Sequence, residues 1–382
     1  MISIAEISHT LETFAPPALA ESWDNVGLIV GSPATEVTGI VVALDVTLDT
    51  IHFARSSGAN LIVSHHPPIF KPVSRLTGET LTSRVVTEAV KSGIALYAVH
   101  TNLDRAPDGV SIALANRLGI RRPVPLCEGN APLMKFVTFV PHESTAAVRE
   151  ALSRSGAGII GNYAECSFTV AGTGTYRPSD DSVPYHGSAG VLESAVEDRI
   201  EMILPAFCVR EAIEAAQAAH PYEKMAYDLI SLSGNDPRYG YGAIGYFESP
   251  MNRRDFSEHV MNALGINSLV CSSCKPEAIR RVAVMGGSGS DYIGWAIEKK
   301  ADAFITSEIG HHDFVDHGSE ILLIDATHLS TETPVLETLK FLLSGTSTTG
   351  AVPVTVYTHR NTDDVPYTTL SRTGNIVQGG TT

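Results

Sequence analysis

The sequence predicts an α/β protein whose parallel-rich core consists of two related halves, interrupted by an inserted α+β domain. Three observations predict it: strands alternate with helices near the N-terminus, the middle follows another order, and the first pattern then returns. At 382 residues the chain is too long for one ordinary core and suits two or three domains. We therefore expect a core domain over 1–129 and 249–369, an inserted domain over 130–248, and a flexible tail over 370–382.

The first half of the core begins with a helix predicted over 2–14, which ends before two prolines. Buried-type strands follow at 39–47, 59–64 and 94–99, with helices predicted between them at 48–57 and 83–92. Strands that alternate with helices imply parallel pairing and right-handed crossovers.

The middle of the chain has a different order of elements. A strand at 135–141 and a helix from Thr145 precede a long stretch rich in Gly, Ser, Tyr and Pro. A strand at 199–205, a helix at 209–220 and a strand at 227–232 complete it. We interpret this as the split β-α-β-β-α-β pattern, and we expect the aromatic residues of this part to lie in its core.

The second half returns to the first pattern, with strands predicted at 281–287, 302–307, 319–326 and 351–358, and helices over 291–300 and from Ser330. Segments 39–70 and 281–314 read alike: strand, loop, helix, Gly or Ala turn, strand, and a His-His pair. This likeness indicates two related halves, although any two strand–helix–strand units share such features. In open α/β sheets, ligands bind at the carboxyl ends of the strands.

Composition excludes several classes of function. A hydrophobic content of 43% with 18% charged residues is typical of a globular protein in water, and no apolar run approaches the roughly 20 residues of a membrane helix. The five scattered cysteines and the absence of a visible secretory signal favour a reducing cytoplasm. A net charge of −15 disfavours nucleic acid or an anionic membrane as the main partner. An anionic substrate remains compatible if a metal supplies positive charge.

Residues of the kinds that bind metals follow four predicted strands. They are His65 and His66 in VSHHPP, His100 and Asp104 in VHTNLD, Glu308, His312 and Asp313 in SEIGHHD, and Asp325, His328 and Glu332 in DATHLSTE. His328 and Glu332 are four residues apart where a helix should begin, so both face one site. Imidazole and carboxylate groups suit Zn²⁺, Fe²⁺ or Mn²⁺.

The adjacent His65 and His66 should point in different directions if their strand continues through them, and would then serve one ion each. Two ions with a carboxylate between them is the economical hypothesis, with His65, His66, Asp104, His328 and Glu332 as ligands. Such ions lie about 3.5–4 Å apart and activate a bridging water. The alternative is that these residues are merely polar strand ends and helix caps.

Three further motifs have weaker implications. GGSGSD, from Gly286, is either a tight turn or a phosphate-binding loop. WDN, from Trp23, is either a turn or a lid over the site. The lone CSSC motif from Cys271 does not support a structural zinc knuckle.

The segments SWDNVGLIVG, VSHHPPIF, HTNLD, ITSEIGHHD and DATHLSTE resemble the GTP cyclohydrolase I type 2 homologs, the Nif-three-like dinuclear metal-centre proteins. The middle of the chain resembles the PII/CutA-like domain of the longer bacterial members. The resemblance implies two divalent ions, either Zn, Fe or Mn, on the same five residues. It also implies His312 near the metals and a toroidal homohexamer.

Two functions are compatible with this sequence. The first is a metal-dependent hydrolase that acts on a nucleotide-like or phosphorylated small molecule through a metal-bridging water, with His312 as a candidate proton shuttle. The second is a non-enzymatic ring that binds or delivers metal, or that regulates, with an insert that senses a small molecule.

Overall fold

The computed structural model describes residues 2–274, 276, 278–345 and 355–359, and the backbone of the strands β18 (Thr369–Leu370) and β19 (Ile376–Val377). The chain forms two compact units: a core unit of Met1–Gly129 with Arg238–Thr382, and an inserted unit of Asn130–Pro237. Apart from these two strands, the tail predicted over 370–382 lies outside the described residues.

The insert ends earlier than the sequence indicated. The predicted range was 130–248, but β12 (Ala243–Met251) pairs with β14 (Ile279–Ser288) in the core unit. The segment that follows Pro237 is therefore part of a core sheet, because its backbone hydrogen bonds are made there.

The first core sheet has five strands, and its central members pair in parallel. In spatial order they are β1 (Gly27–Val30), β4 (Ala95–Ala98), β3 (Leu61–Ser64), β2 (Ile40–Ala43) and β17 (Val356–Thr358). Strands β2, β3 and β4 are buried along their whole length, as expected for apolar runs covered on both faces.

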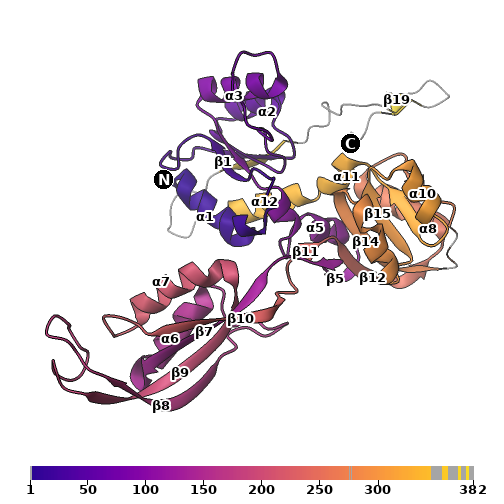
Figure 1. The fold of residues 1–382 in the computed structure, drawn as a ribbon. Helices are drawn as coiled ribbons and strands as arrows, with labels where there is room; N and C mark the ends of the chain where they lie inside the picture. The colour runs from indigo at the N-terminus through magenta and orange to yellow at the C-terminus, as the bar shows by residue number, and fades with distance from the viewer. Residues whose placement is uncertain are drawn as a thin grey trace. The chain divides into compact units, whose positions relative to one another are not determined.

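Helices cover both faces of this sheet (Figure 1). Helices α1 (Ile4–Phe14) and α12 (Val335–Ser344) share one hydrophobic core with the sheet, and α2 (Leu48–Ser56) and α3 (Leu81–Ser92) share another. Helix α1 begins where Ser3 and Glu6 form a reciprocal capping box, which satisfies backbone N–H groups at the helix start.

The second core sheet has six strands, of which β14, β15 (Ala303–Ser307) and β16 (Leu322–Asp325) pair in parallel. The remaining strands are β13 (Val270–Cys271), β12 and β5 (Arg121–Val124). One core lies between this sheet and the helices α5 (Val110–Arg117) and α8 (Arg253–Leu264). A second lies against α9 (Ile293–Glu298) and α10 (His311–His317).

Both core sheets thus contain a strand, a helix and a parallel strand in succession: β2–α2–β3 and β14–α9–β15. Two short helices follow strands of these sheets: α4 (Thr101–Asp104) follows β4, and α11 (His328–Glu332) follows β16. The remaining short elements of the core unit are β6 (Cys127–Glu128), β11 (Gly240–Tyr241), η1 (Pro17–Leu19) and η4 (Ser290–Tyr292). The α/β class with parallel-rich sheets is confirmed.

The inserted unit is an antiparallel four-stranded sheet in the order β10–β7–β9–β8. Its elements along the chain are β7 (Pro132–Pro141), η2 (His142–Ser144), α6 (Thr145–Arg154), β8 (Phe168–Tyr176), β9 (Glu193–Pro205), η3 (Ala206–Cys208), α7 (Val209–Ala219) and β10 (Tyr227–Asn235). Both helices cover one face of the sheet (Figure 1) and share one core with it. Strand β8 lies in the stretch rich in Gly and Ser.

Within the described part of the chain, no helix is long and apolar enough to cross a membrane. Cys127, Cys166 and the two cysteines of the CSSC motif are free thiols.

Candidate metal centre

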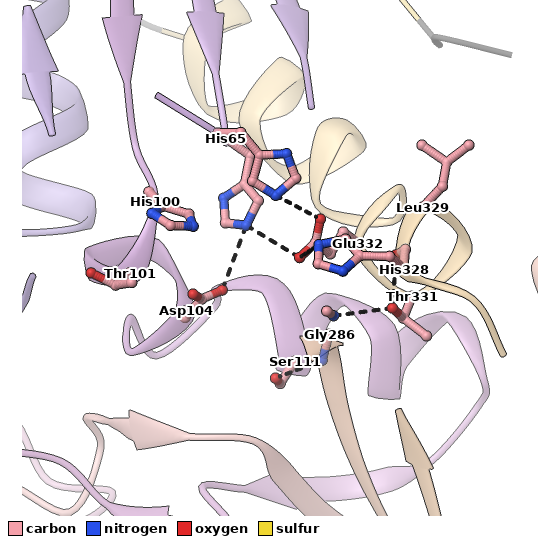
Figure 2. A network of polar contacts seen from close by, with 12 residues as sticks. His65, His100, Thr101, Asp104, Ser111, Gly286, His328, Leu329, Thr331 and Glu332 are labelled. Atoms are coloured by element: carbon pink, nitrogen blue, oxygen red, sulfur yellow. Dashed lines mark hydrogen bonds and ion pairs between the residues drawn. The ribbon is translucent and has the colours of Figure 1, made fainter. Parts of the chain in front are cut away.

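Four histidines and two carboxylates from both halves of the core unit meet beyond the carboxyl ends of β3, β4 and β16 (Figure 2). His65 and His66 directly follow β3, and His100 follows β4. Asp104 ends α4, and α11 supplies the remaining two residues, His328 and Glu332. The ends of the parallel strands and the short helices that follow them therefore bring these residues to one place, as the sequence predicted.

Glu332 lies at the middle of this group. Its Oε1 is 3.0 Å from Nε2 of His328 and 3.7 Å from Nε2 of His65. Its Oε2 is 3.2 Å from Nε2 of His66. The Glu332 side chain is only 5% exposed, so its charge is largely removed from water and depends on these imidazoles.

Each of the four histidines is held in place by an acceptor at its Nδ1 atom. Nδ1 of His65 lies 2.9 Å from the carbonyl oxygen of Val99. The other three Nδ1 atoms lie against carboxylate oxygens: His66 against Asp45 at 3.0 Å, His100 against Asp24 at 2.9 Å, and His328 against Glu308 at 3.0 Å. An acceptor at Nδ1 keeps the proton on that atom and leaves Nε2 free, which is the usual second-sphere arrangement of metal-binding histidines.

Asp24 is the most firmly held of these acceptors. It accepts hydrogen bonds from Nδ1 of His100 at 2.9 Å and from the backbone N–H and hydroxyl of Thr101 at 3.0 and 2.5 Å. Burial acts to raise the pKa of Asp24, but these hydrogen bonds outweigh it and hold the pKa well below its usual range. His100 is therefore oriented by a permanently ionised carboxylate.

The charges at the centre depend on one another. Burial acts to raise the pKa of Glu332, but the adjacent His65 and the hydrogen bond from His328 hold it well below its usual value. Burial acts to lower the pKa of His66, but Asp45 and Glu332 outweigh it and raise that pKa to about 10. Burial raises the pKa of Asp104, whose Oδ1 lies 3.7 Å from Nε2 of His65.

These residues fit a divalent metal. Among the described residues, two groups have donor atoms that all lie within 4.8 Å of one another: His65, His66 and His100, and His66, His328 and Glu332. Oε2 of Glu332 is buried yet makes no hydrogen bond of good geometry, despite its proximity to His66. A buried carboxylate oxygen that lacks a hydrogen bond needs a cation nearby, and imidazole with carboxylate is a suitable donor set.

One glycine leaves room for this carboxylate. A Cβ atom at Gly287 would lie 2.4 Å from Oε1 of Glu332, and Gly287 has a φ of +69°. Its N–H donates to the hydroxyl of Thr331, and the N–H of the adjacent Gly286 donates to Ser111 (Figure 2). The first residues of the GGSGSD motif thus belong to the end of β14, and they pack against the metal centre.

Backbone strain occurs at the same place. Glu308 and Thr327 both have positive φ, +58° and +66°, which are unfavourable for residues with a Cβ. Glu308 provides the acceptor for His328, and Thr327 immediately precedes it. Asp325 stabilises both turns by accepting hydrogen bonds from the N–H groups of Ile309 and Thr327.

An exposed aromatic pair borders the centre. Trp23 and Phe70 are 56% and 49% exposed, and their rings are 5.6 Å apart. The ring of His100 lies 6.2 Å from that of Trp23 and 6.0 Å from that of Phe70. The side-chain amide of Asn25 donates to the carbonyl of Ile69 at 2.6 Å, which connects the two loops. WDN is thus a turn whose Asp24 points inward and whose Trp23 faces solvent.

The five ligand positions predicted from spacing lie close together, but the argument that gave His65 and His66 one ion each loses its basis, and the place of His312 near the metals stays a prediction. β3 ends at Ser64, so His65 and His66 do not alternate along a strand; their rings are 4.9 Å apart, and both join the first group of donor atoms. His312 is exposed on α10 and belongs to neither group.

Sequence reasoning did not identify Asp45, and it named the motifs that contain Asp24 and Gly287 without giving those two residues a role at the site. An aspartate two residues after β2 was the available signal for Asp45.

Comparison with known proteins identifies relatives that match most of this chain. The model of the Duf34/NIF3 family (NGG1p interacting factor 3) matches residues 2–363. A Halalkalibacterium halodurans protein named GTP cyclohydrolase 1 type 2 homolog is 37% identical over 307 residues, 80% of this chain and 82% of the relative. A Mycobacterium tuberculosis protein of the same name is 36% identical over 342 residues, 87% and 89% of the two chains. The crystal structure of a Bacillus cereus protein related to NIF3 has a TM-score of 0.82 at 34% identity, over 94% of this chain and 97% of that one.

Proposed function

Because this chain belongs to the Duf34/NIF3 family, we propose that it is a dinuclear metal-dependent hydrolase of a nucleotide-like or phosphorylated small molecule. The proposed ligands are His65, His66, Asp104, His328 and Glu332, with Zn²⁺, Fe²⁺ or Mn²⁺ as the ion. The printed name of its relatives, GTP cyclohydrolase 1 type 2 homolog, supports a purine nucleotide as the first substrate to test.

One observation supports this proposal above all. The Nε2 atoms of His65, His66 and His328 lie 3.0–3.7 Å from the carboxylates of Asp104 and Glu332, and each of the four imidazoles is held at Nδ1 by a separate acceptor. Without metal, the charge of buried Glu332 is balanced by protonated His66, and a divalent ion would replace that proton as the compensating charge. Two divalent ions at such a site would supply Lewis-acid polarisation and an activated water, which suit both phosphoester and purine-ring hydrolysis.

His100 is the residue best placed to move a proton during that reaction. Its Nδ1 is fixed by ionised Asp24, and its ring lies 5.2 Å from the ring of His65. Nε2 is thus directed toward the reacting region and can give or take a proton there. We therefore assign the proton transfer to His100 rather than to His312, which is exposed on α10.

Trp23 and Phe70 are suited to hold the substrate. A planar base can stack on an exposed aromatic ring, with a stabilisation of about 1–3 kcal/mol per base. Both rings border His100. A base stacked there would therefore direct either its own ring atoms or the attached phosphates toward the metal ligands.

The test is turnover of GTP and of simple phosphoesters by protein loaded separately with Zn²⁺, Mn²⁺ or Fe²⁺. His100→Asn should retain metal but lose about 10²–10⁴-fold in turnover, the range of acid–base catalysis. Glu332→Gln should lose metal and turnover together. Equal turnover by wild-type protein and Glu332→Gln would contradict the proposed site.

The second candidate function is non-enzymatic metal binding or delivery, regulated by the inserted unit. It is favoured by a separate cavity in that unit, lined by aromatic residues. Readily exchanged metal with no turnover across nucleotides and phosphoesters would support it over the hydrolase. We also propose the toroidal homohexamer that the resemblance implies, and light scattering of the purified protein would measure its mass.

A further inference from the structure

The inserted unit contains a cavity of about 300 Å³ that is remote in sequence from every candidate metal ligand. Its wall includes three tyrosines and one buried acid: Tyr176 at the end of β8, Tyr185, Tyr222 and Glu197 of β9. The volume is at the lower end of the range for small-molecule pockets. The sequence predicted the insert's aromatic residues in its core, and Phe136 lies there, whereas these tyrosines line the cavity.

The three rings form adjacent walls. The ring centroid of Tyr222 is 6.4 Å from that of Tyr176 and 5.8 Å from that of Tyr185. The corresponding interplanar angles are 52° and 48°, so the rings are inclined rather than stacked. Inclined rings at this spacing can all lie within about 6 Å of one positive charge, the distance at which cation–π attraction operates.

The three tyrosine hydroxyls already make hydrogen bonds within the protein. That of Tyr222 donates to Oε1 of Glu197 at 2.7 Å, that of Tyr176 to the carbonyl of His186 at 2.8 Å, and that of Tyr185 to Glu143 at 3.4 Å. Burial and the adjacent Glu197 raise the pKa of Tyr222 above its usual value, so it keeps its proton. The tyrosines therefore offer ring faces rather than donors to a ligand.

The charge of the wall is predominantly negative. Glu197 is 9% exposed, and its Oε2 lies 2.1 Å from the position that a Cβ at Gly174 would take. Glu223 also lines the cavity, and its carboxylate accepts from the N–H of Val183 at 3.0 Å. Lys224, the cation among the lining residues, is exposed. The nearby His220 adds no charge at neutral pH, because burial lowers its pKa.

We propose that this cavity binds a small organic cation, of the alkylammonium class, between the three tyrosine rings and the carboxylate of Glu197. The ring faces and one buried acid select a positive charge that carries apolar substituents. An anion would meet two carboxylates and would leave the buried acid unfavourably close to a like charge. The proposal is independent of the metal centre and of its function.

The experiment is calorimetric titration of the full-length protein with choline and with its neutral isostere 3,3-dimethylbutan-1-ol. The two have the same shape and differ in charge. Choline should bind at this site at least about tenfold more tightly, because only the cation is attracted by the rings and by Glu197. Equal binding of the two compounds, or no saturable binding of choline, would overturn the proposal.

Two variants locate the binding. Tyr185→Ala removes one wall at an exposed position and should weaken choline binding severalfold, whereas Tyr163→Ala, at a 75% exposed tyrosine outside the cavity, should not. Glu197→Gln keeps an acceptor for the hydroxyl of Tyr222 and should abolish the preference for choline over the isostere. Binding of inorganic phosphate that is lost in Lys224→Gln, in place of choline binding, would identify an anion site and refute a cation site.

Discussion

Nε2 of His328 lies 3.0 Å from Oε1 of Glu332, four residues later in the same short helix. The helical spacing places both side chains on one face. The same carboxylate contacts His65 and His66, which come from the other half of the core unit. Glu332 therefore connects metal-ligand candidates from both halves.

Substitution of Glu332 should remove metal from the protein. Glu332→Gln keeps the volume of the side chain and removes the charge that faces three imidazoles. We expect affinity for Zn²⁺ or Mn²⁺ to fall by at least about 100-fold, the upper range found for losing even an outer-shell partner. Elemental analysis after dialysis measures this, and unchanged metal content in a folded variant would exclude Glu332 as a ligand.

Substitution of Glu308 should weaken metal binding without removing a ligand. Glu308→Ala deletes the acceptor that holds Nδ1 of His328, and we expect a loss of about 10–100-fold in affinity. Glu320→Ala is the matched control, since its carboxylate is 57% exposed, compared with 59% for Glu308, and it contacts only His317 of the histidines. Equal losses in both variants would show a general electrostatic effect instead.

Gly287→Ala should disable the centre for steric reasons. The new Cβ would meet Oε1 of Glu332 at 2.4 Å, whereas Gly58 has a similar positive φ, +73° compared with +69°, and its Cβ would meet nothing within 4 Å. Both should cost about 1–2 kcal/mol of folding stability from the backbone conformation, but only Gly287→Ala should lose metal. Thermal unfolding and metal content, measured together, distinguish the two effects. Retained metal in Gly287→Ala would contradict this role.

Metal binding should release protons. The pKa of His66 is raised to about 10 in the metal-free protein, so the imidazole is protonated at pH 7–8 and a metal must displace that proton. The apparent affinity should therefore rise with pH and level off only above about pH 10. Glu332 should release none, since its pKa is lowered. Calorimetry in buffers of different ionisation enthalpy counts these protons, and zero release would refute a protonated His66.

Trp23 should report on substrate. The chain has two tryptophans, so Trp295→Phe leaves Trp23 as the single one. Guanosine that stacks on the exposed ring of Trp23 should quench its fluorescence, and Trp23→Leu should raise KM for a nucleotide more than it lowers kcat. Leu81→Ala, at an apolar residue 54% exposed, is the control. Unquenched fluorescence at saturating nucleotide would rule out stacking.

Local signals predicted a large part of this molecule. Buried strands such as β2 and β3 are continuous apolar runs, and the helix predicted over 2–14 corresponds to α1 (Ile4–Phe14). The sequence indicated an insert that ends at residue 248, within β12, where no strand was predicted; the pairing of β12 with β14 decides the unit to which this segment belongs. Strand pairing depends on long-range hydrogen bonds that the local pattern does not specify.

The sequence by itself determined which residues could bind metal, because His65, Asp104 and the pair His328 and Glu332 follow strand ends at spacings that local geometry interprets. Only the tertiary structure decided how those residues are held. The acceptors behind His66, His100 and His328 lie 21, 76 and 20 residues away along the chain. The space that Gly287 leaves for Glu332 is likewise a contact between distant segments. Each of these contacts joins segments of one half that lie apart in the sequence, and it forms only when the strands and loops of that half pack together, which is a property of the fold rather than of any short stretch.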